Sequence, residues 1–223
     1  MEGKRFLILN GSPRKKGTSY SFGRTIKKLI EEEGSTAEII HIIDYLDENK
    51  NIHDLKNIIL KSDMISFISP LYVDTLPYPA IWFFEKLTVE FIHELQGKGF
   101  FAIAQCGFPD IILCEPLLES CRYFAEETGM NWMGGLAYGG GAIINGELLE
   151  NLGKKGKNIT TAFKLALKDV LNGKTISSEP QKLLTVKISK FFYPLLVGIL
   201  NYNSRKTARK YGVTDLSKRT YLE

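Results

Sequence analysis

A short apolar strand pattern, residues 6–9, runs directly into a polar loop and then into an amphipathic helical pattern that begins near Thr18. Around the loop glycines lie three hydroxyl residues, Ser12, Thr18 and Ser19, and three cations, Arg14, Lys15 and Lys16. The first turn of a helix has unpaired backbone N–H groups and the positive end of the helix dipole, so it favours an anion. The sequence therefore predicts a phosphate-binding loop between the first strand and the first helix.

The order of residues in this loop separates it from two common phosphate-binding motifs. A Walker A loop ends in Gly-Lys-Ser/Thr, whereas here Gly11 is followed after four residues by Lys16-Gly17-Thr18, with lysine and glycine transposed. The Gly-x-Gly-x-x-Gly motif of dinucleotide sites is not found at this turn either. The loop argues against a nucleotide triphosphatase and favours a monophosphate that is held by hydroxyls and amides.

The composition is that of a folded domain. The 223 residues are 44% hydrophobic, enough for one substantial core or for a domain with an appendage. The chain opens with no secretory leader pattern and contains no run of eighteen apolar residues, so we expect a cytoplasmic protein without membrane contact. Cys106, Cys114 and Cys121 form no Cys-x-x-Cys pair and are expected to be reduced, buried residues.

Charge is unevenly distributed along the chain. Residues 181–223 contain nine Lys or Arg against two Asp or Glu, and the whole chain has a formal net charge of +4, so residues 1–180 carry −3. The C-terminal cations are interspersed with apolar residues and never form a run of five or six. We therefore expect no nucleic-acid binding.

Hydrophobic periodicity predicts alternating strands and helices. Apolar runs typical of strands lie at 6–9, 37–42, 64–68, 99–104 and 132–138, and a helical spacing follows each of them, at 18–33, 52–59, 80–94, 117–125 and 159–170. Runs that are apolar throughout are typical of strands covered on both faces. The pattern predicts an α/β fold with a doubly wound, five-stranded parallel sheet and helices on both faces. Ligands bind beyond the carboxyl ends of such strands, so the loops after the first, third and fourth strands are expected at one rim.

The chain resembles the flavodoxin-like NAD(P)H-dependent FMN reductases through these three loops. The matching residues are Gly11-Ser12-Pro13-Arg14 with Gly17-Thr18-Ser19, Ser69-Pro70-Leu71-Tyr72 with Pro77-Tyr78-Pro79-Ala80, and Cys106-Gly107-Phe108-Pro109 followed later by Gly139-Gly140-Gly141. The resemblance covers roughly the first three quarters of the chain. It implies a flavodoxin-like fold, an FMN cofactor and NADH or NADPH as the co-substrate.

The resemblance also implies which residues surround the flavin. The first loop would hold the phosphate, the loop after the third strand would border the isoalloxazine, and the loop after the fourth strand would close its other edge. The residues expected to bind the cofactor are Ser12, Arg14, Lys16, Gly17, Thr18, Ser19, Pro70, Leu71, Tyr72, Val73, Gln105, Cys106, Gly107 and Phe108. No catalytic side chain is expected, because the flavin itself carries the hydride chemistry.

A metal centre is not expected. Some members of this family hold an iron–sulfur cluster on a compact group of cysteines near the second helix, and this chain has no cysteine there. His41, His53 and His93 also lack the spacing of metal ligands.

Three functions fit these features. The first is an FMN-dependent oxidoreductase that passes a hydride from NAD(P)H to a quinone, a nitro compound, a flavin or a metal ion. The second is a flavodoxin-like electron carrier that docks redox partners, although such carriers are usually strongly acidic and this chain is not. The third is a flavin-free domain that binds a phosphate ligand. No motif identifies the acceptor or selects between NADH and NADPH.

We expect residues 1–173 to form the FMN-binding domain and residues 174–223 a C-terminal helical extension. Its segment 183–210 combines a ten-residue apolar run, 191–200, which Pro194 and Gly198 interrupt, with four cations, Arg205, Lys206, Arg209 and Lys210. Such a run is too short to span a bilayer. The first expectation for the segment is packing on a partner subunit in a homodimer or higher homo-oligomer. A lid over the flavin comes second and contact with anionic lipid comes last.

Overall fold

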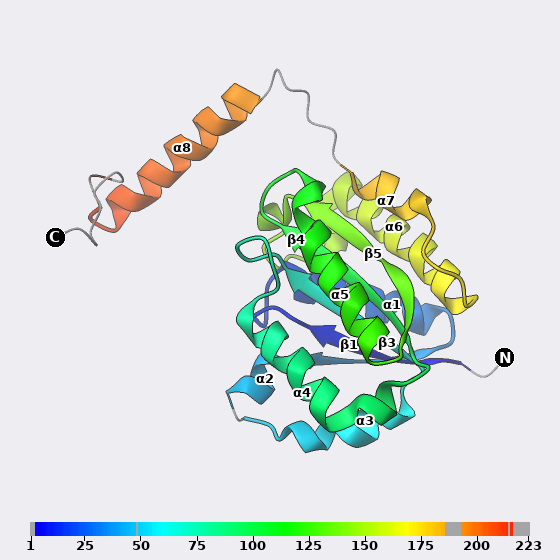
Figure 1. Ribbon diagram of the computed structural model, residues 1–223. Helices are drawn as coiled ribbons and strands as arrows, with labels where there is room; N and C mark the ends of the chain where they lie inside the picture. Colours follow the sequence, from blue (N-terminus) through cyan, green and yellow to red (C-terminus); the bar gives the residue numbers. More distant parts are fainter. Residues whose placement is uncertain (1–2, 48, 186–192, 214, 216–223) are drawn as a thin grey trace. The chain divides into compact units, whose positions relative to one another are not determined.

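The structure is a computed structural model in which residues 3–47, 49–185, 193–213 and 215 are described. Residues 1–186 form one compact unit and residues 187–223 a second. The first unit contains one sheet of parallel strands: β1 (Arg5–Asn10), β2 (Thr36–His41), β3 (Met64–Pro70), β4 (Gly99–Cys106) and β5 (Asn131–Gly139). Their order is β2-β1-β3-β4-β5 (Figure 1). The doubly wound five-stranded parallel sheet predicted from the sequence is confirmed.

Helices connect the strands and cover the sheet. They are α1 (Thr18–Glu32), α2 (Ile43–Leu46), α3 (Leu55–Lys61), α4 (Tyr78–Leu95), α5 (Glu115–Glu127), α6 (Gly153–Leu171) and α7 (Ser178–Leu184). Short 3₁₀ helices are η1 (Ile52–Asp54), η2 (Ile111–Cys114), η3 (Gly141–Ile143) and η4 (Leu149–Leu152). Helix α4 starts two residues before the predicted position, because Pro79 is well tolerated in the first turn of a helix.

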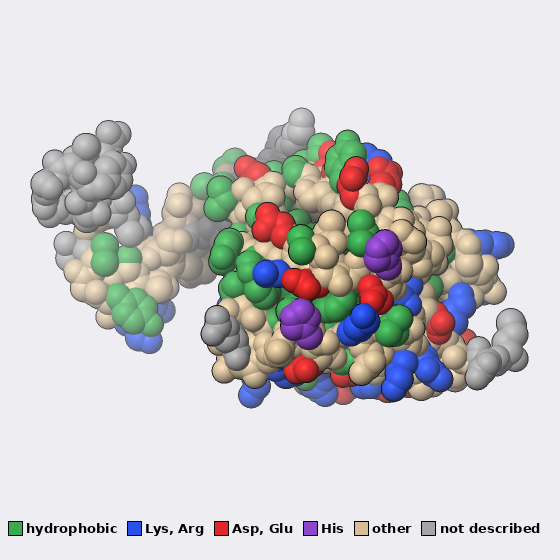
Figure 2. All heavy atoms as spheres, turned by 60° about the horizontal axis from the view of Figure 1, so that its bottom comes forward, with side chains coloured by type: hydrophobic (Ala, Val, Ile, Leu, Met, Phe, Trp, Pro, Cys, Tyr) green, Lys and Arg blue, Asp and Glu red, His purple; other side chains and the backbone are tan. Residues whose placement is uncertain are grey.

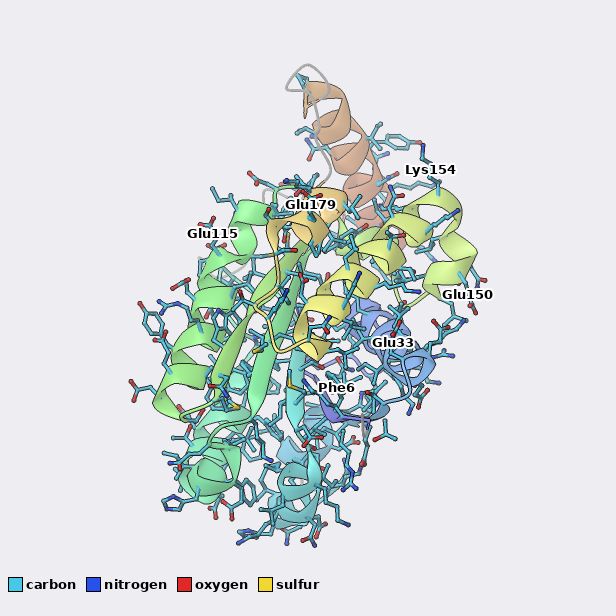
Figure 3. The ribbon with its side chains drawn as sticks, turned by 90° about the vertical axis from the view of Figure 1, so that its right-hand side faces the viewer. Phe6, Glu33, Glu115, Glu150, Lys154 and Glu179 are labelled. Atoms are coloured by element: carbon cyan, nitrogen blue, oxygen red, sulfur yellow. The ribbon has the colours of Figure 1, made fainter. Side chains whose placement is uncertain are left out.

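The sheet separates two hydrophobic cores. Every residue of β3 and β4 is buried, as expected for strands covered on both faces. One core, around Phe67, Phe84 and Phe100, lies between the sheet and helices α3, α4 and α5. The other, around Phe22 and Phe163, lies between the sheet and helices α1 and α6. Figure 3 shows this arrangement from the side: Glu115 at the start of α5 and Glu33 just after α1 lie on opposite sides of the sheet.

The outer face over α2, α3 and α4 carries side chains of both charges, and exposed apolar residues such as Leu60, Ile81 and Val89 also belong to these helices. Figure 2 shows acidic and basic side chains interspersed on the face that is turned forward there. Lys56 of α3 and Glu94 of α4 form an ion pair of 3.1 Å across two helices. Mixed charge of this kind is typical of an ordinary solvated surface.

The edge strand β5 is covered by the segment that follows α6. The backbone N–H of Ile176 donates to the Met133 carbonyl at 2.7 Å. The Gln181 side chain of α7 then pairs with both backbone groups of Ala137, at 2.8 and 2.9 Å. A side-chain amide thus satisfies an exposed strand edge. Because of these contacts, the first compact unit extends to residue 186, beyond the boundary at 173 expected from the sequence.

The second unit contains helix α8 (Tyr193–Lys210). Val197, Ile199 and Tyr202 are exposed on it, and its last turn carries Arg209 and Lys210. Residues 186–192, which belong to the predicted apolar and basic segment, lie outside the described residues. Over the described chain, every helix falls short of the length and apolar character needed to span a membrane.

The aromatic cluster under α5 offers a test of the first core. Phe124 stacks on Phe84 with ring centroids 4.0 Å apart, and its ring centroid lies 5.8 Å from that of Phe100. We expect Phe124→Ala to lower the free energy of unfolding by about 3 kcal/mol, because it removes a buried ring and leaves a cavity. Urea denaturation followed by circular dichroism measures the change.

The matched control is Tyr123→Ala, at the neighbouring position of the same helix. Tyr123 is 56% exposed, so its loss should cost below about 1 kcal/mol. Equal destabilisation by the two variants would contradict the packing described here.

Candidate functional site

An open cavity of about 210 Å³ lies at the carboxyl ends of β1, β3 and β4. It is lined by Ser12, Arg14, Gly17, Thr18, Pro70, Leu71, Tyr72, Gln105, Cys106, Gly107, Gly141, Ala142 and Asn145. Strand order reverses between β1 and β3, and such switch points are where doubly wound sheets bind ligands. The three loops that sequence analysis placed at one rim therefore meet in one cavity.

One end of the cavity is suited to an anion. Helix α1 begins after Gly17, which has no side chain to cap the first N–H groups of the helix. The loop before it is shaped by its own hydrogen bonds: the Asn10 side chain accepts from the Ser12 N–H at 3.2 Å, and the Ser12 hydroxyl accepts from the Arg14 N–H at 3.1 Å. The helix N-terminus, two hydroxyls and one guanidinium therefore line the same end.

The two neighbouring cations Arg14 and Lys15 have different surroundings. Lys15 forms an ion pair with Asp44 of α2, outside the cavity. Arg14 instead donates from Nη2 to the amide oxygen of Asn145 at 2.8 Å. Because that partner is neutral, Arg14 is oriented without losing its charge, and it remains available for an anion in the cavity.

A fourth loop, residues 140–147 after β5, closes this end of the cavity. The Thr18 hydroxyl donates to the Gly141 carbonyl at 2.7 Å, and the Ser21 hydroxyl donates to the Glu147 carbonyl. Gly146 has φ +87°, and a Cβ there would lie 2.3 Å from the Lys16 carbonyl oxygen. The backbone of this loop therefore packs directly on the phosphate-loop backbone, which only glycine allows.

Gly141, Ala142 and Asn145 were not among the residues predicted to bind the cofactor. Gly139-Gly140-Gly141 carried part of the resemblance, and Asn145-Gly146 is a turn signal because both residues favour positive φ; Asn145 has φ +43°. Either signal predicts a turn here. Neither indicates that the turn reaches back to Arg14 and Thr18.

The other side of the cavity is built from the loops after β3 and β4. The Leu71 N–H donates to the Gln105 carbonyl at 2.8 Å, which continues the β3–β4 pairing past the end of the sheet. Tyr72 and Thr75 exchange two backbone hydrogen bonds of 3.0 and 3.1 Å across a tight turn. Apolar side chains from 70–72 and backbone from 105–107 thus form a slot beside the anion-binding end.

Some predicted cofactor residues lie near the cavity but do not line it: Lys16, Ser19, Val73 and Phe108. Ser19 is buried in the first turn of α1, and within the described part of the chain its hydroxyl has no hydrogen-bond partner. Val73 occupies the tip of the tight turn with φ +47°, an uncommon conformation for a β-branched residue, and is 96% exposed. Phe108 is also mostly exposed. The remaining predicted residues line the cavity.

Two titratable side chains at the rim have shifted pKa values. Burial is the main cause that lowers the pKa of His41, which favours the neutral ring, and its Nδ1 lies 2.9 Å from the Asn10 amide nitrogen. A hydrogen bond from the Cys114 thiol is the main cause that lowers the pKa of Cys106 to about 7, while burial opposes it. The Cys106 thiol also donates to the Phe108 carbonyl oxygen at 3.2 Å, so its sulfur is held at the cavity wall by the turn that follows β4.

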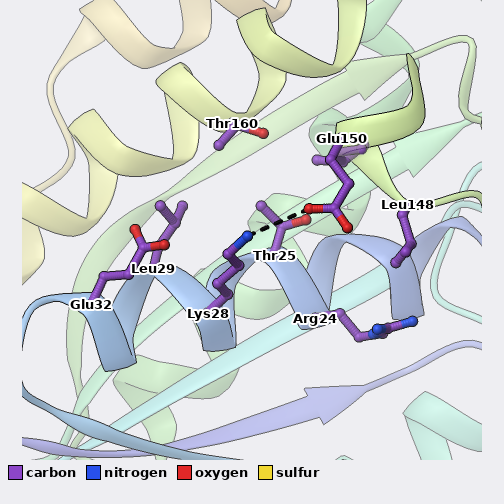
Figure 4. A pocket seen from close by; sticks show the side chains of 9 residues that line it. Arg24, Thr25, Lys28, Leu29, Glu32, Leu148, Glu150 and Thr160 are labelled. Atoms are coloured by element: carbon purple, nitrogen blue, oxygen red, sulfur yellow. Dashed lines mark hydrogen bonds and ion pairs between the residues drawn. The ribbon is translucent and has the colours of Figure 1, made fainter. Parts of the chain in front are cut away.

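A second cavity, of about 270 Å³, lies between α1 and the segment around η4 (Figure 4). Lys28 and Glu150 face each other across it at 3.4 Å, and Arg24 and Glu32 also line it. It lies away from the carboxyl ends of the strands, and its cations are matched by carboxylates. Among the described residues, no group of three or more His, Cys, Asp or Glu is placed to hold a metal ion.

Comparison with known proteins links this architecture to a family. Residues 5–109 match the family model described as NADPH-dependent FMN reductase. The matched segment runs from β1 to the turn after β4 and so contains three of the loops that form the cavity. None of the curated proteins matches the chain.

Several solved structures are similar to this chain. General stress protein 14 from Treponema denticola, solved in complex with FMN, is 12% identical and has a TM-score of 0.53, with 74% of this chain and 99% of that chain covered. An NADPH-quinone reductase from P. pentosaceus is 17% identical with a TM-score of 0.51, covering 72% and 95%. A flavodoxin from Pseudomonas aeruginosa is 16% identical with a TM-score of 0.51, covering 74% and 99%.

At these identities the structural likeness shows the fold, which is flavodoxin-like. The description of the family model supplies the reaction class. Residues 5–109 of this chain are thus similar to the NADPH-dependent FMN reductase family, whose chemistry is FMN-dependent oxidoreduction with NAD(P)H as the co-substrate.

Proposed function

We propose that this protein binds FMN in the cavity between the β1 and β3 loops and passes a hydride from NADH or NADPH, through the flavin, to a small acceptor. The acceptor classes are a quinone, a nitro compound, free flavin and a metal ion. The observation that carries the proposal is the polarity of one continuous cavity, with an anion-binding end at Ser12, Arg14 and Thr18 and an apolar slot at Pro70 to Tyr72. FMN matches this arrangement, because it has a charged phosphate at one end and a flat ring system at the other.

The residues divide into two roles. The hydroxyls of Ser12 and Thr18, the Arg14 guanidinium and the first N–H groups of α1 would hold the phosphate. Pro70, Leu71 and Tyr72 would border the ring, and the backbone N–H groups of Gly107 and Phe108 are candidates to hydrogen-bond its polar edge. Bound FMN supplies the two-electron exchange with the nicotinamide. The protein contributes orientation, charge and an accessible face for the two substrates.

An electron carrier that docks protein partners is a weaker alternative. Residues 1–180 carry a formal charge of only −3, and the face in Figure 2 mixes both signs. Partner docking by charge needs an extended surface of one sign. One of the structures with a similar fold is an NADPH-quinone reductase. This similarity in fold supports a quinone as one acceptor class.

We further propose a cytoplasmic protein that forms a homodimer or a higher homo-oligomer. Cys106, Cys114 and Cys121 are free and buried, as expected in a reducing compartment. In the second unit, the exposed Val197 and Ile199 of α8 would be covered by a partner subunit. The flavin-binding role then belongs to the first unit and the subunit contact to the second.

Flavin binding and reduction are tested directly. Purified protein mixed with FMN and then desalted should retain about one FMN per chain, seen in its visible absorption spectrum. NADH or NADPH should then bleach the flavin rapidly under anaerobic conditions, and quinones, nitro compounds, free flavin and ferric complexes are compared as acceptors. Retained flavin without bleaching would favour the electron carrier. No retained flavin on folded protein would leave the flavin-free phosphate-ligand domain.

The anion-binding end is tested by removing one cation at a time. Arg14→Gln should weaken FMN binding about tenfold, because it removes a charge-assisted hydrogen bond worth about 1.5 kcal/mol. Lys15→Gln is the matched control, since it removes the same charge from a side chain that pairs with Asp44, and should change the affinity less than about twofold. Quenching of FMN fluorescence measures both. If both variants weakened FMN binding equally, Arg14 would contribute only through its overall charge and not through a specific contact with the phosphate.

The role of the second unit is tested by a chain that ends at Thr185. This truncation keeps α7 and its contacts with β5. We expect the full chain to elute as a dimer or larger species and the truncated chain as a monomer that still binds FMN, in size-exclusion chromatography with light scattering. A truncated protein with an unchanged oligomeric state would refute the assignment of the subunit contact to residues 187–223.

A further inference from the structure

A buried amide links His41 to the phosphate-binding loop. Asn10 is the last residue of β1, is 1% exposed, and lies opposite His41 at the end of the neighbouring strand β2. Its Oδ1 accepts from the Ser12 N–H at 3.2 Å, and its Nδ2 lies 2.9 Å from His41 Nδ1. The Ser12 hydroxyl in turn accepts from the Arg14 N–H at 3.1 Å. A chain of polar contacts thus runs from the imidazole to the anion-binding end of the cavity.

The backbone donor at Ser12 decides the orientation of every group in this chain. An N–H group can only donate, so the oxygen of the Asn10 amide faces Ser12 and its NH₂ group faces His41. The NH₂ group can also only donate, and therefore His41 Nδ1 is an unprotonated acceptor. The hydrogen bonds thus assign the neutral tautomer of His41 that carries its proton on Nε2.

A protonated His41 does not fit these contacts. Both nitrogens of an imidazolium donate, so the Nδ1–H group would meet the NH₂ group of Asn10, donor against donor. Turning the amide around would restore the contact with His41 but would place the NH₂ group against the Ser12 N–H. In either orientation the buried amide loses one partner, and a buried polar group without a partner is costly. Only neutral His41 satisfies both ends of the Asn10 amide.

The groups packed around His41 favour the same neutral form. The Tyr20 ring of α1 has its centroid 5.1 Å from that of His41. The charged groups near this pair of rings are Arg24 over the Tyr20 ring, Lys15 of the first loop, Asp44 of α2 and Lys50 of the segment after α2. Burial is the largest cause and lowers the pKa of His41, Asp44 opposes it, and the two lysines lower it again. Both lysines are also ion-paired with Asp44.

We infer that His41, acting through Asn10, is a positioning residue for the FMN phosphate: its neutral Nδ1 fixes the buried amide that holds the Ser12 backbone at the anion-binding end. Because the anion is taken to be the FMN phosphate, this role rests on the proposed function. Protonation of His41 should then weaken FMN binding, although the added positive charge alone would strengthen the binding of an anion. The sign of the effect therefore separates positioning from charge.

The role of His41 is tested on the full chain with FMN and with riboflavin, which has the same ring system but no phosphate. At neutral pH, His41→Leu should weaken FMN binding roughly tenfold, because Asn10 loses its acceptor, and should change riboflavin binding less than about twofold. His41→Asn is the matched control, because its Oδ1 can replace Nδ1 as the acceptor, and its FMN affinity should stay near that of the wild type. Quenching of flavin fluorescence measures all of these affinities.

The outcomes distinguish this inference from the proposed function. Equal FMN affinity of His41→Leu and the wild type would overturn the inference alone, and so would equal weakening of FMN and riboflavin. A folded wild-type chain that binds no FMN would overturn the proposed function and the inference together.

The pH dependence of FMN binding separates positioning from a merely structural role. The FMN phosphate loses charge as the pH falls through about 6, so wild type and His41→Asn should both bind FMN more weakly in acid. Only the wild type also titrates at position 41, and the protonated form grows as the pH falls through the lowered pKa of His41. Between about pH 7.5 and about pH 5, the wild type should therefore lose at least about threefold more affinity than His41→Asn. Parallel profiles, or a smaller loss in the wild type, would contradict the inference.

A titration by NMR tests the hydrogen bonds without flavin. In wild-type protein the Ser12 amide signal should shift with the midpoint of the His41 ring, and His41→Asn should abolish this shift. Titration of His53, whose side chain is 66% exposed on η1, is the internal control and should leave the Ser12 signal unchanged. A Ser12 signal that does not follow His41 would show that Asn10 does not connect the two.

Discussion

The close approach of the first loop to β3 determines the geometry of the whole site. The Gly11 N–H donates to the Ile68 carbonyl at 2.9 Å, so the chain leaves β1 while still paired with β3. A Cβ on Gly11 would lie 2.6 Å from the Phe67 ring, and therefore only glycine lets the backbone cross there. This crossing directs residues 12–17 over the sheet edge and places the N-terminus of α1 at the cavity. A larger residue at this position would force the buried Phe67 ring or the loop backbone to shift.

Much of this arrangement could be predicted because it depends on local patterns. Parallel strands buried on both faces give uninterrupted apolar runs, and β3 and β4 could be located from these alone. Once the strands are known, topology places Ser12, Leu71 and Gln105 at one rim, since all parallel strands end on the same side. The contacts of Arg14 with Asn145 and of Gln181 with Ala137 could not be predicted in the same way. Each contact joins residues far apart in sequence through a single side chain, and hydrophobic periodicity gives no signal for a contact of this kind.

Charge at the anion-binding end depends on which neighbour each cation meets. Lys15 and Arg14 are adjacent in sequence, yet Lys15 meets a carboxylate and Arg14 meets an amide. An amide oxygen accepts a hydrogen bond without cancelling charge, so it fixes the guanidinium in place and leaves its field directed at the cavity. The loop after β5 therefore belongs to the site functionally as well as spatially. Through Asn145 this loop orients Arg14, which composition alone does not distinguish from Lys15.

The same reasoning changes the interpretation of the cysteines. A buried cysteine is usually a small hydrophobic residue, and Cys121 fits that description. Cys106 differs because it ends a strand, and the end of a strand in this fold is where backbone groups lose their sheet partners and turn toward a ligand. Its thiol donates to the Phe108 and Asp110 carbonyl oxygens and so replaces part of that lost pairing. The polar contacts of Cys106 follow from its position at the end of β4, the same constraint that places the phosphate loop.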